Sequence, residues 1–202
     1  MNIGLIDYGA GNLTSVIKGL TAVGATVRVT SSPMALTGIE ALVIPGVGHF
    51  DATRALGDDW RRAIRDRLDA GLPLLGICLG LQWLFEGSDE APGLEGLGLF
   101  AGRCFRLPDV VKVPHVGWNT LDDSGRSSRM LSGMPIGAMA YFTHSFAAPV
   151  SSVTASITTH GAPFASAVER AQVFGTQFHP EKSGTTGLRL LRNFISAARE
   201  AR

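Results

Sequence analysis

Along the first half of the chain, segments with the apolar pattern of a strand alternate with segments that have the apolar spacing of a helix. Short apolar runs predict strands at residues 2–8, 39–44 and 72–77, and alternation of apolar and polar residues predicts another at residues 25–30. Other segments repeat apolar residues every three or four positions, which predicts helices at residues 13–23, 58–70 and 79–85. Alternation of this kind predicts an α/β fold, in which a doubly wound, mostly parallel sheet is flanked by helices.

The second half of the chain has shorter apolar runs and more turn residues. Glycines divide residues 93–102 into short β-like pieces. Strands are predicted at residues 153–157, 164–168 and 173–178, with turns at Gly161 and around Arg170. Residues 185–201 return to helical spacing. We therefore expect short antiparallel strands to be added to the parallel sheet, and a helix to end the chain.

Composition and charge favour a soluble protein whose partner is neither nucleic acid nor membrane. The 202 residues fit a single domain, 1–202, that buries roughly 70% of its unfolded surface. Charged residues make up 17% of the chain and the net charge is +1, so no strong field recruits nucleic acid or an anionic membrane. The longest apolar run, residues 72–81, is far shorter than the roughly 20 residues that span a bilayer. Two cysteines form no disulfide framework and no signal peptide precedes the first strand, so we expect a cytoplasmic protein.

Cys78 lies where the fourth predicted strand meets the third predicted helix. Gly76 and Gly80 flank it two residues away on either side, the spacing of a nucleophile elbow, in which a strand turns sharply into a helix. Backbone N–H groups at a helix start favour a thiolate. Cysteine is also among the most often buried residue types. Cys78 alone therefore leaves open whether it is a nucleophile or a small apolar core residue.

Two glycine-rich turns follow predicted strands. Residues 9–11 (Gly-Ala-Gly) open the first helix, but they lack the third glycine and the lysine of phosphate-binding loops, which argues against a nucleotide site. Residues 45–48 (Pro-Gly-Val-Gly) predict a loop at the carboxyl edge of the sheet, where open α/β sheets bind ligands. Glycines there let backbone N–H groups approach a ligand closely.

His179 and Glu181 supply the other groups that a cysteine nucleophile requires. In an extended segment residues two apart share a face, so the imidazole and the carboxylate point the same way. A carboxylate beside an imidazole fixes its tautomer and stabilises its charged form. Cys78, His179 and Glu181 would therefore form a catalytic triad if the fold brings them together. From the residues alone, His179 and Glu181 could equally be a surface pair or part of a satisfied loop network.

The remaining histidines and the second cysteine suggest no further chemistry. The histidines stand at positions 49, 115, 144 and 160 without the spacing of metal ligands. We therefore expect neither a metal site nor a cofactor. Cys104 lies in a strand-like piece without glycines and is interpreted as a core residue.

Six stretches of the sequence form a specific combination. Three are residues 45–48, 76–82 and 177–183 (Pro-Gly-Val-Gly, Gly-Ile-Cys-Leu-Gly-Leu-Gln and Gln-Phe-His-Pro-Glu-Lys-Ser). The other three are residues 7–12, 113–119 and 141–146 (Asp-Tyr-Gly-Ala-Gly-Asn, Val-Pro-His-Val-Gly-Trp-Asn and Tyr-Phe-Thr-His-Ser-Phe). The first set resembles the class I, triad-type glutamine amidotransferases, which implies a flavodoxin-like sheet. The second resembles the glutaminase subunits of imidazole glycerol phosphate synthases in histidine biosynthesis.

This resemblance implies a reaction and a set of site residues. Cys78 would attack the side-chain amide of glutamine to form a γ-glutamyl thioester, while His179 protonates the departing ammonia and Glu181 holds His179. Backbone N–H groups that stabilise the oxyanion would come from Gly46, Val47, Gly48 and Leu79. The amino-acid end of glutamine would be bound by Gln82, His144, Ser145 and Phe146.

The resemblance also implies a partner, because a chain of 202 residues has no room for a second catalytic domain that uses the ammonia. In the family this partner is a (β/α)₈ cyclase subunit. It receives ammonia through an internal path and makes imidazole glycerol phosphate and an aminoimidazole carboxamide ribotide. The residues that would lie toward the partner are Asn12, Trp118 and Lys182.

Other functions remain open from the sequence. The chain could be the glutaminase subunit of another amidotransferase, a stand-alone cysteine hydrolase of the same fold, or a regulatory binding module with a silent site. Residues 113–119 favour imidazole glycerol phosphate synthase over other amidotransferases. A stand-alone hydrolase would differ by acting without a cyclase.

Overall fold

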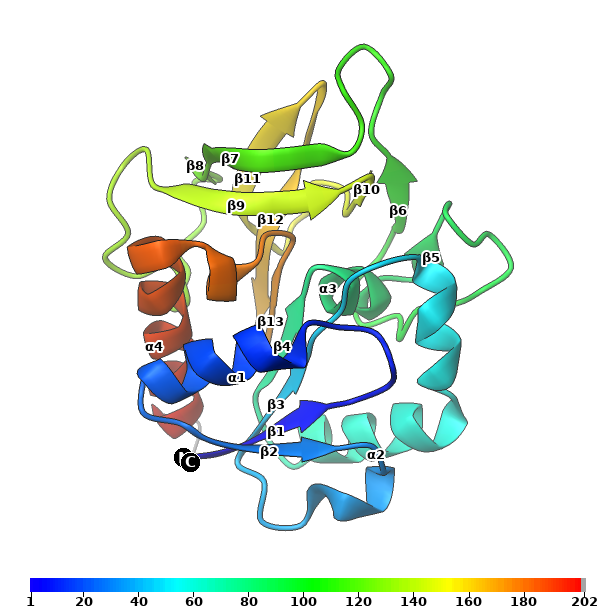
Figure 1. Cartoon of the computed structure of the whole chain (residues 1–202), viewed down its shortest axis with the longest axis vertical. Helices are drawn as coiled ribbons and strands as arrows, with labels where there is room; N and C mark the ends of the chain where they lie inside the picture. The colour runs from blue at the N-terminus through cyan, green and yellow to red at the C-terminus, as the bar shows by residue number, and fades with distance from the viewer. Residues whose placement is uncertain (201–202) are drawn as a thin grey trace.

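The computed structural model describes residues 1–200 and is organised around an eight-stranded sheet (Figure 1). The strand order is β2-β1-β3-β4-β13-β12-β11-β8. The first five in this order are parallel: β1 (Asn2–Ile6), β2 (Thr26–Thr30), β3 (Ala41–Ile44), β4 (Leu74–Ile77) and β13 (Val173–Thr176). An antiparallel extension follows: β12 (Ala162–Arg170), β11 (Thr154–His160) and β8 (Asp122–Asp123).

Two small sheets complete the β structure. One joins β10 (Phe146–Ala147), β6 (Arg103–Arg106) and β5 (Gly87–Ser88). The other is the antiparallel pair β7 (His115–Thr120) and β9 (Met139–His144). The β9 strand lies against the segment that follows β13, because the His179 N–H donates to the Tyr141 carbonyl at 2.9 Å. The β7–β9 pair is therefore held beside the predicted triad.

Helices cover both faces of the main sheet, and the sheet separates the hydrophobic core into two clusters. The helices are α1 (Leu13–Ala22), α2 (Asp58–Asp69), α3 (Leu79–Leu84) and α4 (Gly184–Glu200), with 3₁₀ turns η1 (Pro33–Leu36), η2 (Phe50–Ala55) and η3 (Pro180–Lys182). On β3, Val43 packs with α1 and α4 on one face, whereas Leu42 and Ile44 pack with α2 on the other. This alternation follows from the period of two along a strand. Within residues 1–200, no helix combines the length and apolarity needed to cross a bilayer.

The predicted fold class is confirmed: the sheet is mostly parallel, flanked by helices and extended by antiparallel strands. The predicted helix at 185–201 is α4, although Ala201 lies outside the described residues. The strands β7 and β9 were not predicted as strands. In β7 the two large apolar residues, Val116 and Trp118, face solvent and the inward positions hold His115 and Asn119, so no apolar core face marks this strand in the sequence.

The prediction of β-like pieces at residues 93–102 is wrong. Apart from one isolated bridge between Glu95 and Gly87, this segment is a loop. It satisfies the end of α3, because the Gly98 and Leu99 N–H groups donate to the Phe85 and Leu84 carbonyls at 3.0 and 2.8 Å. A Cβ on Gly96 would lie 2.0 Å from the Phe85 carbonyl oxygen. The glycines therefore allow the backbone to pass close to the end of a helix, and they do not mark the ends of strands.

Candidate active site

Cys78 occupies a sharp turn between β4 and α3. Its φ and ψ are 53° and −104°, in a region that residues with side chains rarely adopt. A Cβ on Gly76 would lie 2.7 Å from the Gly80 carbonyl oxygen, and a Cβ on Gly80 would lie 2.0 Å from that of Ile44. The two glycines thus allow the strained turn that their spacing predicts, and the Cys78 side chain is fixed at the carboxyl edge of the sheet.

His179 reaches this edge because β13 pairs with β4 in parallel. Thr176 lies opposite Ile77, and the Cys78 N–H donates to the Thr176 carbonyl at 2.7 Å. Three residues later, His179 begins the η3 turn with Pro180 in its first position. Residues 101 positions apart are thereby brought together by strand register.

His179 and Glu181 form a buried pair. The His179 Nδ1 lies 2.8 Å from the Glu181 Oε1, and the two side chains are 1% and 2% exposed. Burial alone would lower the pKa of the His179 imidazole, but the neighbouring Cys78 sulfur and the Glu181 carboxylate outweigh it and raise that pKa to about 10. The imidazolium is therefore the favoured form of His179 at neutral pH.

Gln177 holds the Cys78 sulfur from the other side. Its Nε2–H donates to the Cys78 Sγ at 3.6 Å, and its Oε1 accepts from the Gln82 Nε2 at 3.2 Å. The Gln82 Nε2 also donates to the Phe146 carbonyl at 2.7 Å. Because both Gln82 bonds use its NH₂ group, a ligand would meet its amide oxygen.

A pocket of about 260 Å³ opens beside Cys78, close to the lower end of ordinary ligand sites. Its lining comes from five parts of the chain: Gly48, Cys78, Leu79, Gln82, Glu90, Pro114, Thr143, His144, Ser145 and Phe146. Most of the predicted oxyanion and substrate residues are thus assembled around one cavity. Gly46 and Val47 do not line it, whereas His179 and Glu181 lie buried behind Cys78.

The segment Gly46–Gly48 passes directly in front of α3. A Cβ on Gly46 would lie 2.4 Å from the Tyr8 hydroxyl and 2.7 Å from the Leu79 Cβ. The Tyr8 hydroxyl donates to the Pro45 carbonyl at 2.8 Å and so fixes the start of the segment. Gly48, at φ +100°, faces the pocket in a conformation that glycine adopts readily.

Comparisons with known proteins agree with this geometry. The family model described as glutamine amidotransferase class-I matches residues 4–198. The chain belongs to this family. It is 47% identical over 196 residues to a protein of Deinococcus radiodurans and 47% identical over 198 residues to one of Thermococcus kodakarensis, both named imidazole glycerol phosphate synthase subunit HisH. These alignments cover 94% and 95% of this chain, and 91% and 98% of the relatives.

Solved structures share this fold. A putative GMP synthase subunit of Thermoplasma acidophilum has a TM-score of 0.75 at 20% identity, covering 99% of this chain and 94% of that one. PurLQS of Thermotoga maritima has a TM-score of 0.74 at 17% identity, covering 96% and 97%. At these identities the likeness establishes the fold alone.

Two polar residues at this candidate site, Glu90 and Gln177, are not among those that the sequence predicts. Glu90 is the acidic side chain among the described residues that line the pocket, and its Oε2 accepts the Phe50 N–H at 2.7 Å. Gln177, fully buried, bridges Cys78 and Gln82. The sequence could have indicated Gln177, because it lies two residues before His179 in the motif at residues 177–183. Glu90 lies in a loop with no distinctive pattern.

Three histidines that look scattered in the sequence meet in the structure. The His115 Nδ1 lies 3.1 Å from the His144 Nε2, and the His115 ring stacks on that of His160 at 4.1 Å between centroids. The His144 Nδ1 lies 2.9 Å from the Phe146 carbonyl oxygen, so both His144 nitrogens contact protein atoms. Within residues 1–200, no group of three or more potential ligands is arranged to hold a metal ion.

The predicted interface residues differ in their surroundings. Trp118 is 53% exposed on β7 and packs edge-on against Tyr141, whose ring the Lys182 ammonium approaches to 5.9 Å. These three side chains, together with the exposed Val116, form an apolar surface with one cation beside the triad. Asn12 instead caps α1, where its side-chain oxygen accepts the Ser15 N–H at 3.3 Å.

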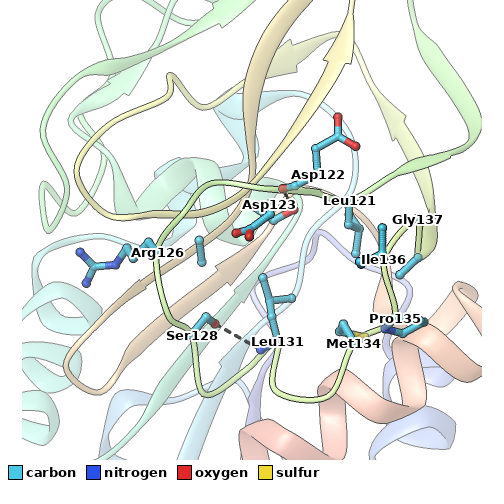
Figure 2. Close-up of a pocket in the computed structure, with 13 residues that line it drawn as sticks. Leu121, Asp122, Asp123, Arg126, Ser128, Leu131, Met134, Pro135, Ile136 and Gly137 are labelled. Atoms are coloured by element: carbon cyan, nitrogen blue, oxygen red, sulfur yellow. Dashed lines mark hydrogen bonds between the residues drawn. The ribbon is translucent and has the colours of Figure 1, made fainter.

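A second cavity of about 360 Å³ lies between the loop after β8 and β11 (Figure 2). Its inner wall is mainly apolar, with Leu121, Leu131 and Met134 around it. The Arg126 guanidinium points away from it and donates to the Ser152 and Glu169 carbonyls. Because none of the triad residues lines this cavity, the smaller pocket beside Cys78 is the candidate active site.

Proposed function

We propose that this protein is the glutaminase subunit of an imidazole glycerol phosphate synthase, in which it supplies ammonia to a cyclase subunit. The observation that carries the proposal is the buried His179–Glu181 pair behind a cysteine on a strained elbow, at a pocket of amino-acid size. The long, nearly full-length similarity to proteins named HisH selects this synthase among the amidotransferases.

The first half of the reaction transfers the γ-glutamyl group to the enzyme. The Cys78 thiolate attacks the side-chain amide carbon of glutamine, and a C–S bond forms as the carbonyl π pair moves to oxygen. His179 then gives its Nε2 proton to the amide nitrogen. The C–N bond breaks, ammonia leaves and a γ-glutamyl thioester remains on Cys78.

The second half restores the enzyme. Neutral His179 takes a proton from water, the hydroxide attacks the thioester carbon, and the C–S bond breaks to release glutamate and the Cys78 thiolate. Glu181 accepts the His179 Nδ1–H throughout, at the observed 2.8 Å, and so directs Nε2 toward the reacting atoms.

Backbone donors would stabilise the oxyanion of both tetrahedral intermediates. Leu79 supplies one N–H at the start of α3, next to the nucleophile. The second would come from the Gly46–Gly48 segment. Glycine at position 46 lets this segment pass close to Leu79, with which a side chain there would collide. Removing one donor of this type typically costs about 10²–10³ in rate.

The pocket offers complementary groups for the amino-acid end of glutamine. The Glu90 carboxylate suits the α-ammonium group, because an ammonium donates strong, charge-assisted hydrogen bonds to a carboxylate. The main chain at Ser145 and Phe146, with the Gln82 amide oxygen, supplies polar contacts on the facing wall. His144 would act through its backbone and through the orientation of its ring, rather than by contacting glutamine with a free ring nitrogen.

The partner would dock on the β7–β9 surface. Trp118 is an exposed aromatic side chain of the kind that anchors interfaces, and Val116 adds exposed apolar surface beside it. Lys182 offers a cation for an ion pair. A (β/α)₈ cyclase placed there would lie next to the ammonia released at Cys78. We further propose that residues 1–202 form one domain and act in the cytoplasm, in keeping with two cysteines that are both free and buried.

The proposal is tested in the protein reconstituted with its cyclase. Cys78→Ala should abolish synthesis of imidazole glycerol phosphate from glutamine and leave synthesis from added ammonium at the wild-type rate. Loss of both activities would indicate a folding or docking defect. Retention of the glutamine-dependent reaction would refute the role of Cys78.

A further inference from the structure

A continuous hydrogen-bond chain runs from the partner-facing strand β7 to the wall of the pocket. The Asn119 Nδ2 lies 3.3 Å from the His115 Nε2, the His115 Nδ1 lies 3.1 Å from the His144 Nε2, and the His144 Nδ1 lies 2.9 Å from the Phe146 carbonyl oxygen. The triad mechanism uses none of these three side chains.

The chain has one consistent arrangement of protons. A carbonyl oxygen only accepts, so the His144 Nδ1 carries hydrogen and, in the neutral ring, Nε2 accepts. The His115 Nδ1 must then donate and its Nε2 must accept from the Asn119 NH₂ group. The orientation of the Asn119 amide agrees, because its oxygen accepts the Thr120 N–H at 2.8 Å and its NH₂ donates to the Thr159 carbonyl at 3.1 Å.

Burial favours the neutral rings that this arrangement needs. His115 and His144 are 4% and 7% exposed. Phe142 stacks on His115 at 4.8 Å between centroids, and Phe164 packs edge-on against His144 at 5.0 Å. Burial lowers the pKa of His115 to about 4 and that of His144 to about 3. Both rings are therefore neutral at pH 7 and can keep one fixed tautomer.

The far end of the chain fixes a wall of the pocket. The Phe146 carbonyl accepts from both His144 and Gln82, at 2.9 and 2.7 Å, so the main chain there is held by two donors. His144, Phe146 and Gln82 all line the cavity beside Cys78. The near end lies on β7, where residues alternate sides: Trp118 points outward to solvent, and Asn119 and His115 point inward.

We propose that Asn119 and His115 are positioning residues for glutamine: they hold His144 in its Nδ1–H tautomer, and His144 in turn orients the Phe146 carbonyl and the pocket wall. This inference rests on the proposed function, since it assigns the pocket to glutamine. The residues act on binding of the amino-acid end rather than on the reacting amide. Their loss should therefore raise KM and leave kcat nearly unchanged.

Three variants in the cyclase complex test the proposal. His115→Leu removes both hydrogen bonds of the ring, whereas His115→Asn keeps a donor near the position of Nδ1. His160→Leu is the matched control: its ring also stacks on His115, but its Nε2 bonds the Lys112 carbonyl outside the chain. We expect KM for glutamine to rise about tenfold in His115→Leu and to stay within about twofold of wild type in His115→Asn and His160→Leu.

The tautomers are read independently in wild-type protein labelled with ¹⁵N-histidine, by long-range ¹H–¹⁵N spectra of the imidazoles. We expect His115 and His144 as neutral Nδ1–H forms, and loss of the fixed His144 tautomer in His115→Leu. A wild-type His144 in the Nε2–H form would overturn the proposal even if a variant fails to fold. Equal KM values in His115→Leu and His160→Leu would also overturn it. Absence of glutamate release by the wild-type complex would instead refute the proposed function and leave the tautomer result standing.

Discussion

Substitution of Gly80 by alanine tests whether the turn that carries the proposed nucleophile requires a residue without a side chain. The new Cβ would lie 2.0 Å from the Ile44 carbonyl oxygen, well short of an ordinary contact of 3.4 Å or more. Ile44 cannot retreat freely, because β3 is paired on both sides, with β1 and with β4. The strain must be taken up by α3 and the Cys78 turn. We expect the free energy of unfolding to fall by about 3 kcal/mol, which corresponds to a drop of about 6–12 °C in Tm.

The assay for Gly80→Ala combines urea unfolding with glutamate release in the cyclase complex. Movement of Cys78 by about 1 Å should lower kcat by about 10²-fold even in the folded fraction. Gly93→Ala is the matched control, because a Cβ there meets no atom within 4 Å. Its stability should stay within about 0.5 kcal/mol of wild type. If Gly80→Ala is as stable and as active as Gly93→Ala, the steric explanation of the elbow is wrong.

Three further predictions concern charge. Glu181→Gln should lower kcat by about 10²–10⁴ with KM nearly unchanged, because an amide neither stabilises the imidazolium nor enforces the Nδ1–H tautomer of His179; steady-state rates that match wild type would contradict this. Glu90→Gln should raise KM for glutamine about 10–100-fold, because it removes the carboxylate that we propose to bind the ammonium group. Asp89→Asn, at the exposed neighbouring residue, should leave KM unchanged, and equal KM values in the two variants would exclude the assignment. Stability should fall as pH drops from about 6.5 toward 4, with a slope of up to about 1.4 kcal/mol per pH unit for each buried histidine, because unfolded His115 and His144 bind protons there and the folded rings do not. Urea unfolding of wild type and His115→Asn at pH 7 and pH 5 measures this, and an identical pH dependence in both would contradict it.

Sequence reasoning succeeded where the signal is local. The spacing of Gly76, Cys78 and Gly80 predicted a strand-to-helix turn, because steric crowding at such a turn acts over only a few residues. The apolar periods likewise predicted the parallel strands and the helices that flank them. The sequence predicts the triad only on the condition that the fold brings His179 to Cys78. That proximity depends on the parallel register of β13 with β4, which no local pattern encodes.

Sequence reasoning failed where the cause is a long-range contact. His115 and His144 lie opposite each other in the β7–β9 pair. His160 ends β11 in the main sheet, and its ring reaches His115 because β11 lies beside β7. Gly96 is required by its close approach to the Phe85 carbonyl and does not separate β-like pieces. Every residue has a backbone carbonyl, so no residue type in the sequence signals this contact. Glu90 enters the pocket through a loop whose path follows from contact with Phe50 rather than from periodicity.

The most direct test of the account is the rate of glutamate release from glutamine, measured for this chain alone and then with the cyclase and its ribonucleotide ligand. We predict slow release by the isolated chain, a rise by orders of magnitude in the complex, and complete loss in Cys78→Ala. A complex that makes imidazole glycerol phosphate from ammonium, yet releases no glutamate from glutamine, would contradict the account.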